Sequence, residues 1–321
     1  MPKLLIYIPT FNRYLKLKLC LERVFAEIAG HENDVRIHVS DNHSDDETLE
    51  YLKSQANDIL TFTRNSHNIG GAKNILGAHR FKHLADFTLI LGDDDYLLGR
   101  SIGILLSAIK NNPDVDLFFI NSIAYEESRS GDILKFMNQC DWKMLPNGGS
   151  TKSCVIDNFR CSFKDLINPK IDEVFGGSLM CYVFRSRLVN DLISEKIDGV
   201  KFGGIYSSYP HTLNFINSLS PECSAAHLAQ PFTLNFWHKG AEWGYQTYDL
   251  IVTQGLGFLF FELCRLGFVE KSNQEIFFNH YIYIAKPSLE KLLDLNNRSD
   301  MILFDPIYMT QLLAFLVKYK I

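Results

Sequence analysis

Short apolar runs alternate with stretches of helical periodicity through the first 120 residues of this chain. Five apolar runs are predicted to be buried strands: residues 4–8, 35–39, 59–63, 87–91 and 116–120. Helical spacing of apolar residues separates them, at residues 17–28, 45–55, 70–83 and 101–110. This order of elements predicts an α/β fold with a parallel, doubly wound sheet. In such sheets, ligands bind beyond the carboxyl ends of the strands.

The rest of the chain has a different pattern. Periodicity is weaker between residues 124 and 169, and from Tyr245 onwards the pattern is helical and rich in Phe and Tyr. We therefore expect a helical, aromatic-rich C-terminal region. Three roles stay open for its aromatic side chains: packing of the helices on one another, a homo-oligomer interface, and an apolar, lysine-edged surface that rests on a membrane.

The composition excludes several classes of protein. With 32 Lys and Arg against 37 Asp and Glu, the net charge is −5, which argues against binding nucleic acid through clustered basic residues. No window supplies the roughly 18 uninterrupted apolar residues of a membrane span. The N-terminus lacks the apolar stretch of a signal peptide. The seven cysteines are scattered and include no Cys-x-x-Cys pair, which favours reduced, buried thiols. We therefore expect a cytoplasmic protein.

Three consecutive carboxylates follow the strand predicted at residues 87–91. The segment Gly92-Asp93-Asp94-Asp95 places them directly at the end of a buried run. Adjacent carboxylates repel one another and lose solvation when enclosed, so a bound cation is the simplest explanation. Carboxylate oxygens suit hard cations such as Mg²⁺ or Mn²⁺, which often bridge to substrate phosphates. The alternative is a solvated acidic turn.

Polar segments also follow the first three predicted strands. They are Pro-Thr-Phe-Asn-Arg at 9–13, Asp-Asn-His-Ser-Asp-Asp at 41–46, and Asn-Ser-His-Asn-Ile-Gly-Gly at 65–71. Each alone is compatible with turn chemistry, because Asn, Asp and Gly are common turn formers. In a parallel sheet, these segments and the acidic turn crowd one edge, which predicts a single ligand site there.

With these segments, and with Asn-Ile-Gly-Gly-Ala-Lys-Asn at 68–74, the sequence resembles the family 2 glycosyltransferases of GT-A fold. The motifs match in order and spacing across the first 120 residues or so. The resemblance implies a Rossmann-like mixed, mostly parallel sheet flanked by helices. It implies a catalytic domain over residues 1–244, with a nucleotide-sugar-binding half (1–122) and an acceptor half (123–244), followed by the helical region over 245–321.

The resemblance also assigns residue roles. Asp41 is expected to meet the base or ribose, and the acidic turn matches the family's DxD motif. A divalent cation, Mn²⁺ or Mg²⁺, is implied at Asp95, with Asp93 and His238 beside it. The residues expected to bind the nucleotide sugar are Pro9, Thr10, Asn12, Arg13, Asp41, Asn42, Asn68, Gly70, Lys73, Asp93, Asp94 and His238. Arg13, Lys73 and Arg100 are the basic residues near this predicted pocket, and each is a candidate phosphate contact.

The catalytic base is the least defined role. Family members usually carry an acidic residue at the start of a helix well beyond the DxD motif. Here residues 203–213 hold no carboxylate, and His211 lies closest to the expected position. Histidine is competent as a base near neutral pH. Asp172 and Glu173 are the other candidates. The alternatives are a structural hydrogen bond for His211 and a solvated loop for the acidic pair.

The function implied is a metal-dependent, inverting transfer of a sugar from a nucleoside diphosphate sugar to a glycan or lipid-linked glycan, as in bacterial surface polysaccharide assembly. The acceptor hydroxyl attacks directly, a base takes its proton, and the cation stabilises the departing diphosphate. Two alternatives stay open. A sugar-nucleotide nucleotidyltransferase normally has a glycine-rich phosphate loop, which is absent here. A non-catalytic nucleotide-sugar-binding subunit is favoured by the missing carboxylate near His211. Peripheral contact with the inner face of a membrane is also open.

Overall fold

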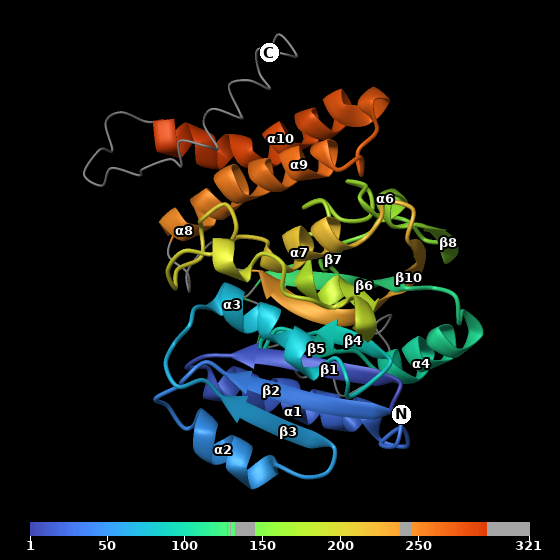
Figure 1. The fold of residues 1–321 in the computed structure, drawn as a ribbon, viewed down its shortest axis with the longest axis vertical. Helices are drawn as coiled ribbons and strands as arrows, with labels where there is room; N and C mark the ends of the chain where they lie inside the picture. Colours follow the sequence, from blue (N-terminus) through green and yellow to red (C-terminus); the bar gives the residue numbers. More distant parts are fainter. Residues whose placement is uncertain (127, 129, 132–144, 238–244, 294–321) are drawn as a thin grey trace.

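One mixed β-sheet organises the protein (Figure 1). The computed structural model describes residues 1–126, 128, 130–131, 145–237 and 245–293. Ten strands of this part form the sheet in the order β3-β2-β1-β4-β9-β6-β10-β5, with β7 on β6 and β8 on β10. The strands are β1 (Leu4–Thr10), β2 (Val35–Asp41), β3 (Leu60–Arg64), β4 (Phe87–Ile90), β5 (Tyr96–Leu97), β6 (Leu117–Glu126), β7 (Ser150–Thr151), β8 (Phe159–Ser162), β9 (Tyr182–Arg185) and β10 (Ser224–Trp237).

Six of the described strands point the same way. β1 to β4 are parallel, and β10 is parallel to β6. β9 is antiparallel to both β4 and β6, so β6 and β10 share the direction of the first four strands. The mixed, mostly parallel sheet implied by the family resemblance is therefore confirmed. The five strands predicted from the alternation are β1 to β4 and β6, and all five run in the same direction, as predicted; the antiparallel strand β9 lies between β4 and β6. The central antiparallel strand β9 is buried on both faces, and such a strand reads in sequence like a parallel one.

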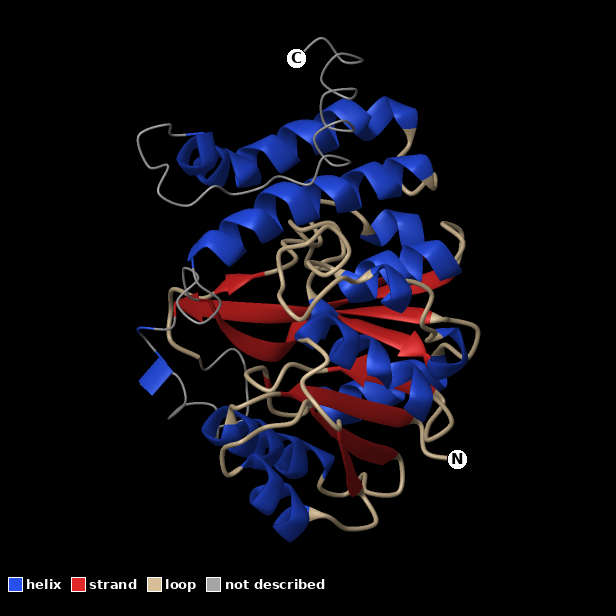
Figure 2. Ribbon diagram, turned by 60° about the vertical axis from the view of Figure 1, so that its left-hand side comes forward, coloured by secondary structure: helices blue, strands red, loops and turns tan. Residues whose placement is uncertain are grey.

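Helices pack on both faces of the sheet. Because strand–helix–strand crossovers are right-handed, α1 and α2 lie on one face and α3 on the other. Figures 1 and 2 show α9 and α10 side by side in a layer at the opposite end of the molecule from β3. The helices are α1 (Tyr14–Ile28), α2 (Thr48–Gln55), α3 (Gly71–Leu76), α4 (Ser101–Asn111), α6 (Phe163–Leu166), α7 (Pro210–Ser218), α8 (Tyr245–Leu250), α9 (Leu256–Arg265) and α10 (Gln274–Leu293).

The predicted elements of the first 120 residues are confirmed, with shifted ends. The helix predicted at residues 45–55 begins only at Thr48, because the Asp46 carboxylate accepts a hydrogen bond from the backbone N–H of Thr48 (3.0 Å). The other oxygen of Asp46 accepts from the backbone N–H of Tyr14 (2.9 Å), at the start of α1. The helix predicted at residues 70–83 divides into α3 and a 3₁₀ turn over Gly77–Phe81.

The helical C-terminal region is confirmed, and its aromatic residues form part of the core. Phe260, Phe278 and Tyr281 are fully buried. Phe175, from the loop before β9, stacks on Phe277 with ring centroids 5.7 Å apart and lies 5.9 Å from Phe260. The described part of this region therefore packs on the sheet-containing part through aromatic contacts. The domain boundary at residue 244 stays a prediction. No helix among the described residues has the length and apolar character needed to cross a membrane.

A π-helical turn joins α8 to α9 and brings them onto the segment before α7. It spans Ile251–Gly255. A Cβ atom at Gly255 would lie 2.2 Å from Cβ of Ser208, so the two backbones meet at a distance that only glycine permits. Ser208 itself donates from Oγ to the carbonyl of Gly204 (2.9 Å). The C-terminal helices therefore pack directly against the residues that precede His211.

We expect Gly255→Ala to lower the free energy of unfolding by about 1–3 kcal/mol, as overpacking of a dense interior does. The gain in helix propensity, about 1 kcal/mol, opposes this loss. Urea denaturation measures the difference. Combining Gly255→Ala with Ser208→Gly removes the clashing atom and should recover most of the loss in a double-mutant cycle. If Gly255→Ala destabilises the protein equally with and without Ser208→Gly, the contact between the two residues is not the cause.

Candidate functional site

The carboxyl ends of β1 to β4 bring the four polar segments to one edge of the sheet, as predicted. In the register of the sheet, Thr10 at the end of β1 pairs with Asp41 at the end of β2, and Asp41 pairs with Arg64 at the end of β3. β4 is the other neighbour of β1, and the acidic turn follows it. The polar segments that are separated in sequence therefore form one continuous surface.

The loops after β1 and β2 are locked together. Asn12 donates its backbone N–H to Ser44 Oγ (2.9 Å), and Asn12 Oδ1 accepts from the backbone N–H of Asp45 (2.8 Å). Ser44 donates its own N–H to Asp41 Oδ1 (2.9 Å). Arg64 Nη2 donates to the carbonyl of Ser44 (2.8 Å). These bonds fix the backbone around Asp41. Ser44 and Arg64 thus join the site without having been predicted from the sequence.

Asp41 is fully buried, and one of its oxygens is available to a ligand. Oδ1 accepts the bond from Ser44, whereas Oδ2 has no hydrogen-bond partner among the described residues. The nearest cation is Arg64, whose Nε lies 3.7 Å from Oδ2. A buried acceptor without a donor is costly unless something supplies one. The geometry therefore leaves Asp41 Oδ2 free to accept a hydrogen bond from a bound molecule.

Side-chain amides brace the loop before α3. Asn42 Oδ1 accepts from Asn65 Nδ2 and from the backbone N–H of Ile69, both at 3.0 Å. Asn42 Nδ2 donates to Asn68 Oδ1 (2.8 Å), which also accepts from the N–H of Gly70. The amides of Asn42 and Asn68 are thus engaged within the protein, where they set the entry into α3. Lys73 lies half-buried on that helix.

The acidic turn is attached to β1 through Asp93. Thr10 Oγ1 donates to Asp93 Oδ2 (2.7 Å), and Arg13 Nη1 donates to Asp93 Oδ1 (2.8 Å). The same Arg13 nitrogen lies 3.1 Å from Asp94 Oδ2, and Lys16 Nζ lies 3.9 Å from it. Asp93 is 3% exposed, so its charge is balanced by groups from the neighbouring strand and not by water. Arg13 therefore contacts the acidic turn directly.

Asp95 is the carboxylate with the least compensation. It is 7% exposed, and its Oδ2 accepts only a 3.1 Å bond from the backbone N–H of Gly92. Within the described ranges, no Lys or Arg nitrogen lies within ion-pair distance of it. Burial, reinforced by the adjacent Asp94 charge, raises the pKa of Asp95 to about 8. Burial likewise raises the pKa of Asp93 to about 6, against the lowering effect of Arg13.

These carboxylates fit a hard divalent cation. Two buried carboxylates on one turn, of which only Asp93 has a cationic side-chain partner, are stabilised by a cation that accepts oxygen ligands. The described residues contain no ready-made group of three His, Cys, Asp or Glu side chains with metal-site geometry, so the remaining ligands would be other oxygens or a bound molecule. His238, predicted as a third ligand, lies outside the described residues.

His211 lies in the first turn of α7, at the end of the helix nearest the ligand edge. It is 4% exposed. Its Nε2 is 3.2 Å from the carbonyl of Gly177 and must donate to it, so Nδ1 carries the lone pair. Nδ1 is buried and has no partner among the described residues. Burial lowers the pKa of His211 to about 3, which keeps the ring neutral.

Asp172 is enclosed and holds the loop on which His211 rests. Its carboxylate accepts from Ser178 N (3.1 Å), Ser178 Oγ (2.9 Å) and Val174 N (3.2 Å). The carbonyls of Gly176 and Gly177, in the same loop, accept from the side chains of Thr212 and His211. Burial raises the pKa of Asp172, and the charge of Lys152 opposes the rise. Asp172 is thus placed to position His211.

Glu173 differs from its neighbour. Its side chain is 58% exposed, and Oε1 lies 3.5 Å from Nζ of Lys152. Lys152 comes directly after β7 and donates its backbone N–H to the carbonyl of Ser122. The side chain of Glu173 is thus mostly exposed, whereas that of Lys152 is mostly buried. Of the three predicted base candidates, Glu173 is the exposed one, and Lys152 was not predicted from the sequence.

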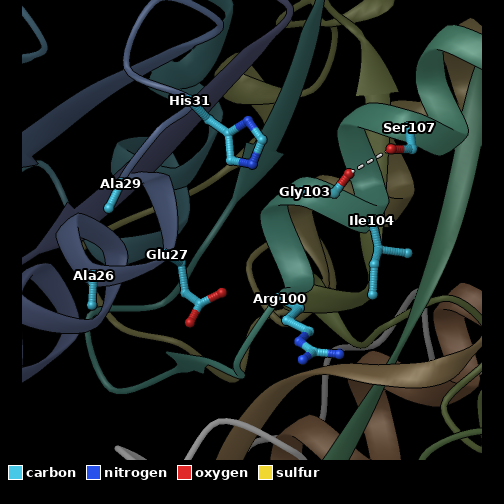
Figure 3. A pocket seen from close by; sticks show the side chains of 8 residues that line it. All are labelled: Ala26, Glu27, Ala29, His31, Arg100, Gly103, Ile104 and Ser107. Carbon is cyan, nitrogen blue, oxygen red and sulfur yellow. Dashed lines mark hydrogen bonds between the residues drawn. The ribbon is translucent and has the colours of Figure 1, made fainter.

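Arg100 is not part of this edge. α1 begins where β1 ends and runs back along the sheet, so its last turn lies at the opposite edge. Arg100 lines a depression of about 480 Å³ with Glu27, in that last turn, and His31, just beyond the end of α1 (Figure 3). Glu27 there pairs with Arg23 (3.0 Å). The predicted phosphate contact of Arg100 is therefore wrong, because the turn after β5 carries the residue away from the acidic turn.

Comparison with known proteins identifies relatives of this architecture. A family model described as glycosyl transferase family 2 matches residues 5–168. A structure of S. aureus TarS matches with a TM-score of 0.61 and 15% identity, covering 91% of this chain and 46% of that one. A structure of TarS 1–349 in complex with UDP-GlcNAc matches with a TM-score of 0.62 and 14% identity, covering 92% and 77%.

A third structure, the mannosyltransferase PcManGT from Pyrobaculum calidifontis in complex with GDP-Man and Mn²⁺, matches with a TM-score of 0.51 and 12% identity, covering 100% of this chain and 81% of that one. At these identities the likeness shows the fold. This chain spans about half the length of the first TarS chain. No curated protein sequence is significantly similar.

The raised pKa values of Asp93 and Asp95 predict how the stability of the metal-free protein depends on pH. Between the ordinary Asp pKa of about 3.9 and the raised values of about 6 and 8, the folded protein binds more protons at Asp93 and Asp95 than the unfolded chain. The free energy of unfolding should therefore fall as pH rises through this window. Asp95→Asn should flatten the slope and raise the melting temperature at pH 8. Thermal denaturation in EDTA measures both.

Asp58→Asn is the matched control, because Asp58 is an exposed carboxylate outside the site. It should leave the slope as in the unmodified protein. A slope that Asp95→Asn does not change would show that Asp95 is not the group that titrates.

Proposed function

The chain belongs to the family 2 glycosyl transferases, because the family model matches just over half of it, and we propose that it moves a sugar from a nucleoside diphosphate sugar to a glycan or lipid-linked glycan acceptor. We further propose that the reaction uses a divalent cation, Mn²⁺ or Mg²⁺, and inverts the anomeric centre. The observation that carries the proposal is the burial of Asp93 and Asp95 on the same sheet edge as Asp41.

The donor is proposed to lie along the ends of β1, β2 and β4. Asp41 Oδ2, which lacks a donor, accepts a hydrogen bond from the base or ribose. Pro9 and Thr10 end the neighbouring strand β1, Asn12 lies in the loop after it, and Arg13 supplies a positive charge near the diphosphate. The relatives whose structures hold UDP-GlcNAc and GDP-Man carry different bases and sugars, so they support a nucleotide-sugar donor without selecting one.

Asp95 and Asp93 would hold the cation. When bound, it supplies positive charge that stabilises the departing nucleoside diphosphate. Thr10 and Arg13 fix Asp93, and the backbone of Gly92 fixes one oxygen of Asp95, so this chain prepares the carboxylates before any ligand arrives. The Mn²⁺ in the PcManGT structure supports a metal in a protein of this fold.

His211 is proposed as the base that takes the proton of the acceptor hydroxyl. Its Nδ1 carries the lone pair and has no partner among the described residues, whereas Nε2 is fixed on the Gly177 carbonyl. The low pKa keeps the ring unprotonated, so the lone pair is available, and the negative charge of a bound donor would favour the protonated form. Asp172 orients the loop under His211. Glu173 is the alternative base, because its carboxylate is exposed.

The setting of the reaction is proposed from the family. Assembly of a bacterial surface polysaccharide from cytoplasmic nucleotide sugars fits a transferase with a glycan or lipid-linked acceptor. The C-terminal helices present Ile276 and Tyr283 to solvent, which fits contact with the surface that carries a lipid-linked acceptor. Family membership favours the transferase over a sugar-nucleotide nucleotidyltransferase.

We expect Asp95→Ala to abolish release of nucleoside diphosphate from a panel of nucleotide sugars with Mn²⁺ or Mg²⁺. The reason is that the departing diphosphate loses the charge that stabilises it. The assay is run with and without candidate acceptors. Asp58→Ala, at the exposed control position, should retain activity. Formation of a nucleoside triphosphate and a sugar 1-phosphate when pyrophosphate is added to the nucleotide sugar would support the nucleotidyltransferase. Binding without turnover across a broad acceptor panel would support a binding subunit.

His211→Ala should lower kcat by roughly 10²-fold or more, the usual contribution of a general base, while the affinity for the nucleotide sugar stays within a few-fold. Stopped turnover assays and calorimetric titration measure the two quantities. His211→Gln tests the alternative, because glutamine can donate to the Gly177 carbonyl but offers no basic nitrogen. If His211→Gln restores turnover, the histidine has a structural role and Glu173 becomes the preferred base.

A further inference from the structure

The strand that faces the acidic turn carries a polar residue that the proposed reaction has not used. β5 pairs antiparallel with β10, with Leu97 opposite Thr233 and Tyr96 opposite Leu234. The N–H of Leu98 donates to the carbonyl of Phe232 (2.8 Å), so the same register continues one residue beyond Leu97. Continued one residue before Tyr96, the register places Asp95 opposite Asn235.

The aromatic neighbours show that the two segments stay together beyond the last ladder pair. Tyr96 and Phe236 meet edge to face, with ring centroids 6.1 Å apart. Side chains alternate between the faces of a sheet, so Tyr96, Leu234 and Phe236 occupy one face. Asp95 and Asn235 then occupy the other face, where directly opposed residues have Cβ atoms about 5 Å apart.

The side-chain oxygen of Asn235 lacks a donor. Oδ1 is buried and makes no hydrogen bond to the described residues. An amide oxygen in this condition loses its hydration without compensation. Asp95 across the strand pair is also an acceptor, and its carboxylate has only the Gly92 N–H within the described structure. A cation between the two residues would satisfy the buried Asn235 oxygen and the Asp95 charge together, because carbonyl and carboxylate oxygens are the ligands of Mg²⁺ and Mn²⁺.

We propose that Asn235 supplies an amide oxygen to the divalent cation held by Asp95. The inference rests on the proposed function, because it assigns a further ligand to the cation of that reaction. With Asn235 as a ligand, β10 becomes part of the metal site, and the cation would link β10 to the turn after β4. The competing arrangement is a structural one, in which the Asn235 amide nitrogen donates to Asp95 and the residue never contacts a metal.

The test is the affinity for Mn²⁺ of the full chain in saturating UDP and, separately, in saturating GDP. Electron paramagnetic resonance of free Mn²⁺ measures binding without relying on catalysis. Asn235→Ala should weaken Mn²⁺ binding about tenfold or more, as loss of groups around a metal typically does. Asn235→Asp should bind Mn²⁺ at least as tightly as the unmodified protein, because a carboxylate oxygen replaces the amide oxygen.

Thr233→Val is the matched control. Thr233 lies on the same strand and face, its Oγ1 is also buried without a partner among the described residues, and it stands opposite Leu97. It should bind Mn²⁺ normally. Thermal denaturation in EDTA checks that each variant is folded.

Two results would overturn the inference. Normal Mn²⁺ affinity in Asn235→Ala would exclude a ligand role, and weakened affinity in both Asn235→Ala and Asn235→Asp would show that the amide N–H, not its oxygen, matters. Asp95→Asn separates this failure from failure of the proposed function. If the unmodified protein binds Mn²⁺ and Asp95→Asn does not, the cation site stands whatever Asn235 does. If the unmodified protein shows no binding that depends on Asp95, the metal dependence itself fails, and the inference with it.

Discussion

The ion pair between the half-buried Arg13 and the buried Asp93 sets the geometry of the ligand edge. A carboxylate that is 3% exposed can stay ionised only if neighbouring groups replace its water, and here they come from Thr10 and Arg13, at the end of the adjacent strand. The turn after β4 is therefore tied to the loop after β1. Asp95, two residues on, has no such partner in the described structure, so the same turn holds one compensated and one uncompensated carboxylate.

In the loops after β1, β2 and β3, neutral side chains take the place of water as hydrogen-bond partners. Ser44, Asn12 and the Asn42–Asn68 pair satisfy one another, so the backbone around Asp41 is rigid without a ligand. In the part of the chain that the structure describes, seven buried side-chain N or O atoms lack a hydrogen-bond partner, and such exceptions are informative. The buried atoms without partners at this edge include Asp41 Oδ2, Asn235 Oδ1 and His211 Nδ1. They fall at three different proposed contacts: the nucleoside, the cation and the acceptor hydroxyl.

The sequence predicts the ligand edge well because its information is local. Each strand is an apolar run, and each polar segment follows one directly, so a parallel arrangement brings Thr10, Asp41 and Asp93 together without knowledge of side-chain contacts. Non-local features were not predictable in this way. β9 is antiparallel although its residues are as apolar as those of a parallel strand, and Arg100 lies at the far edge because the chain reverses at β5. The pairing of Asn235 with the acidic turn depends on strand register, which no local pattern encodes.

Glycines allow close contacts on both sides of the segment that leads to His211. A Cβ atom at Gly70 would lie 2.8 Å from the Cα atom of Val200, so the residue before α3 accepts the backbone of the loop before α7 because it carries no side chain. Gly255 meets Ser208 in the same way from the other side. The segment that leads to His211 is thus held between the start of α3 and the C-terminal helices. The aromatic residues of α9 and α10 therefore contribute to the position of His211, because they fix the helices that press on this segment.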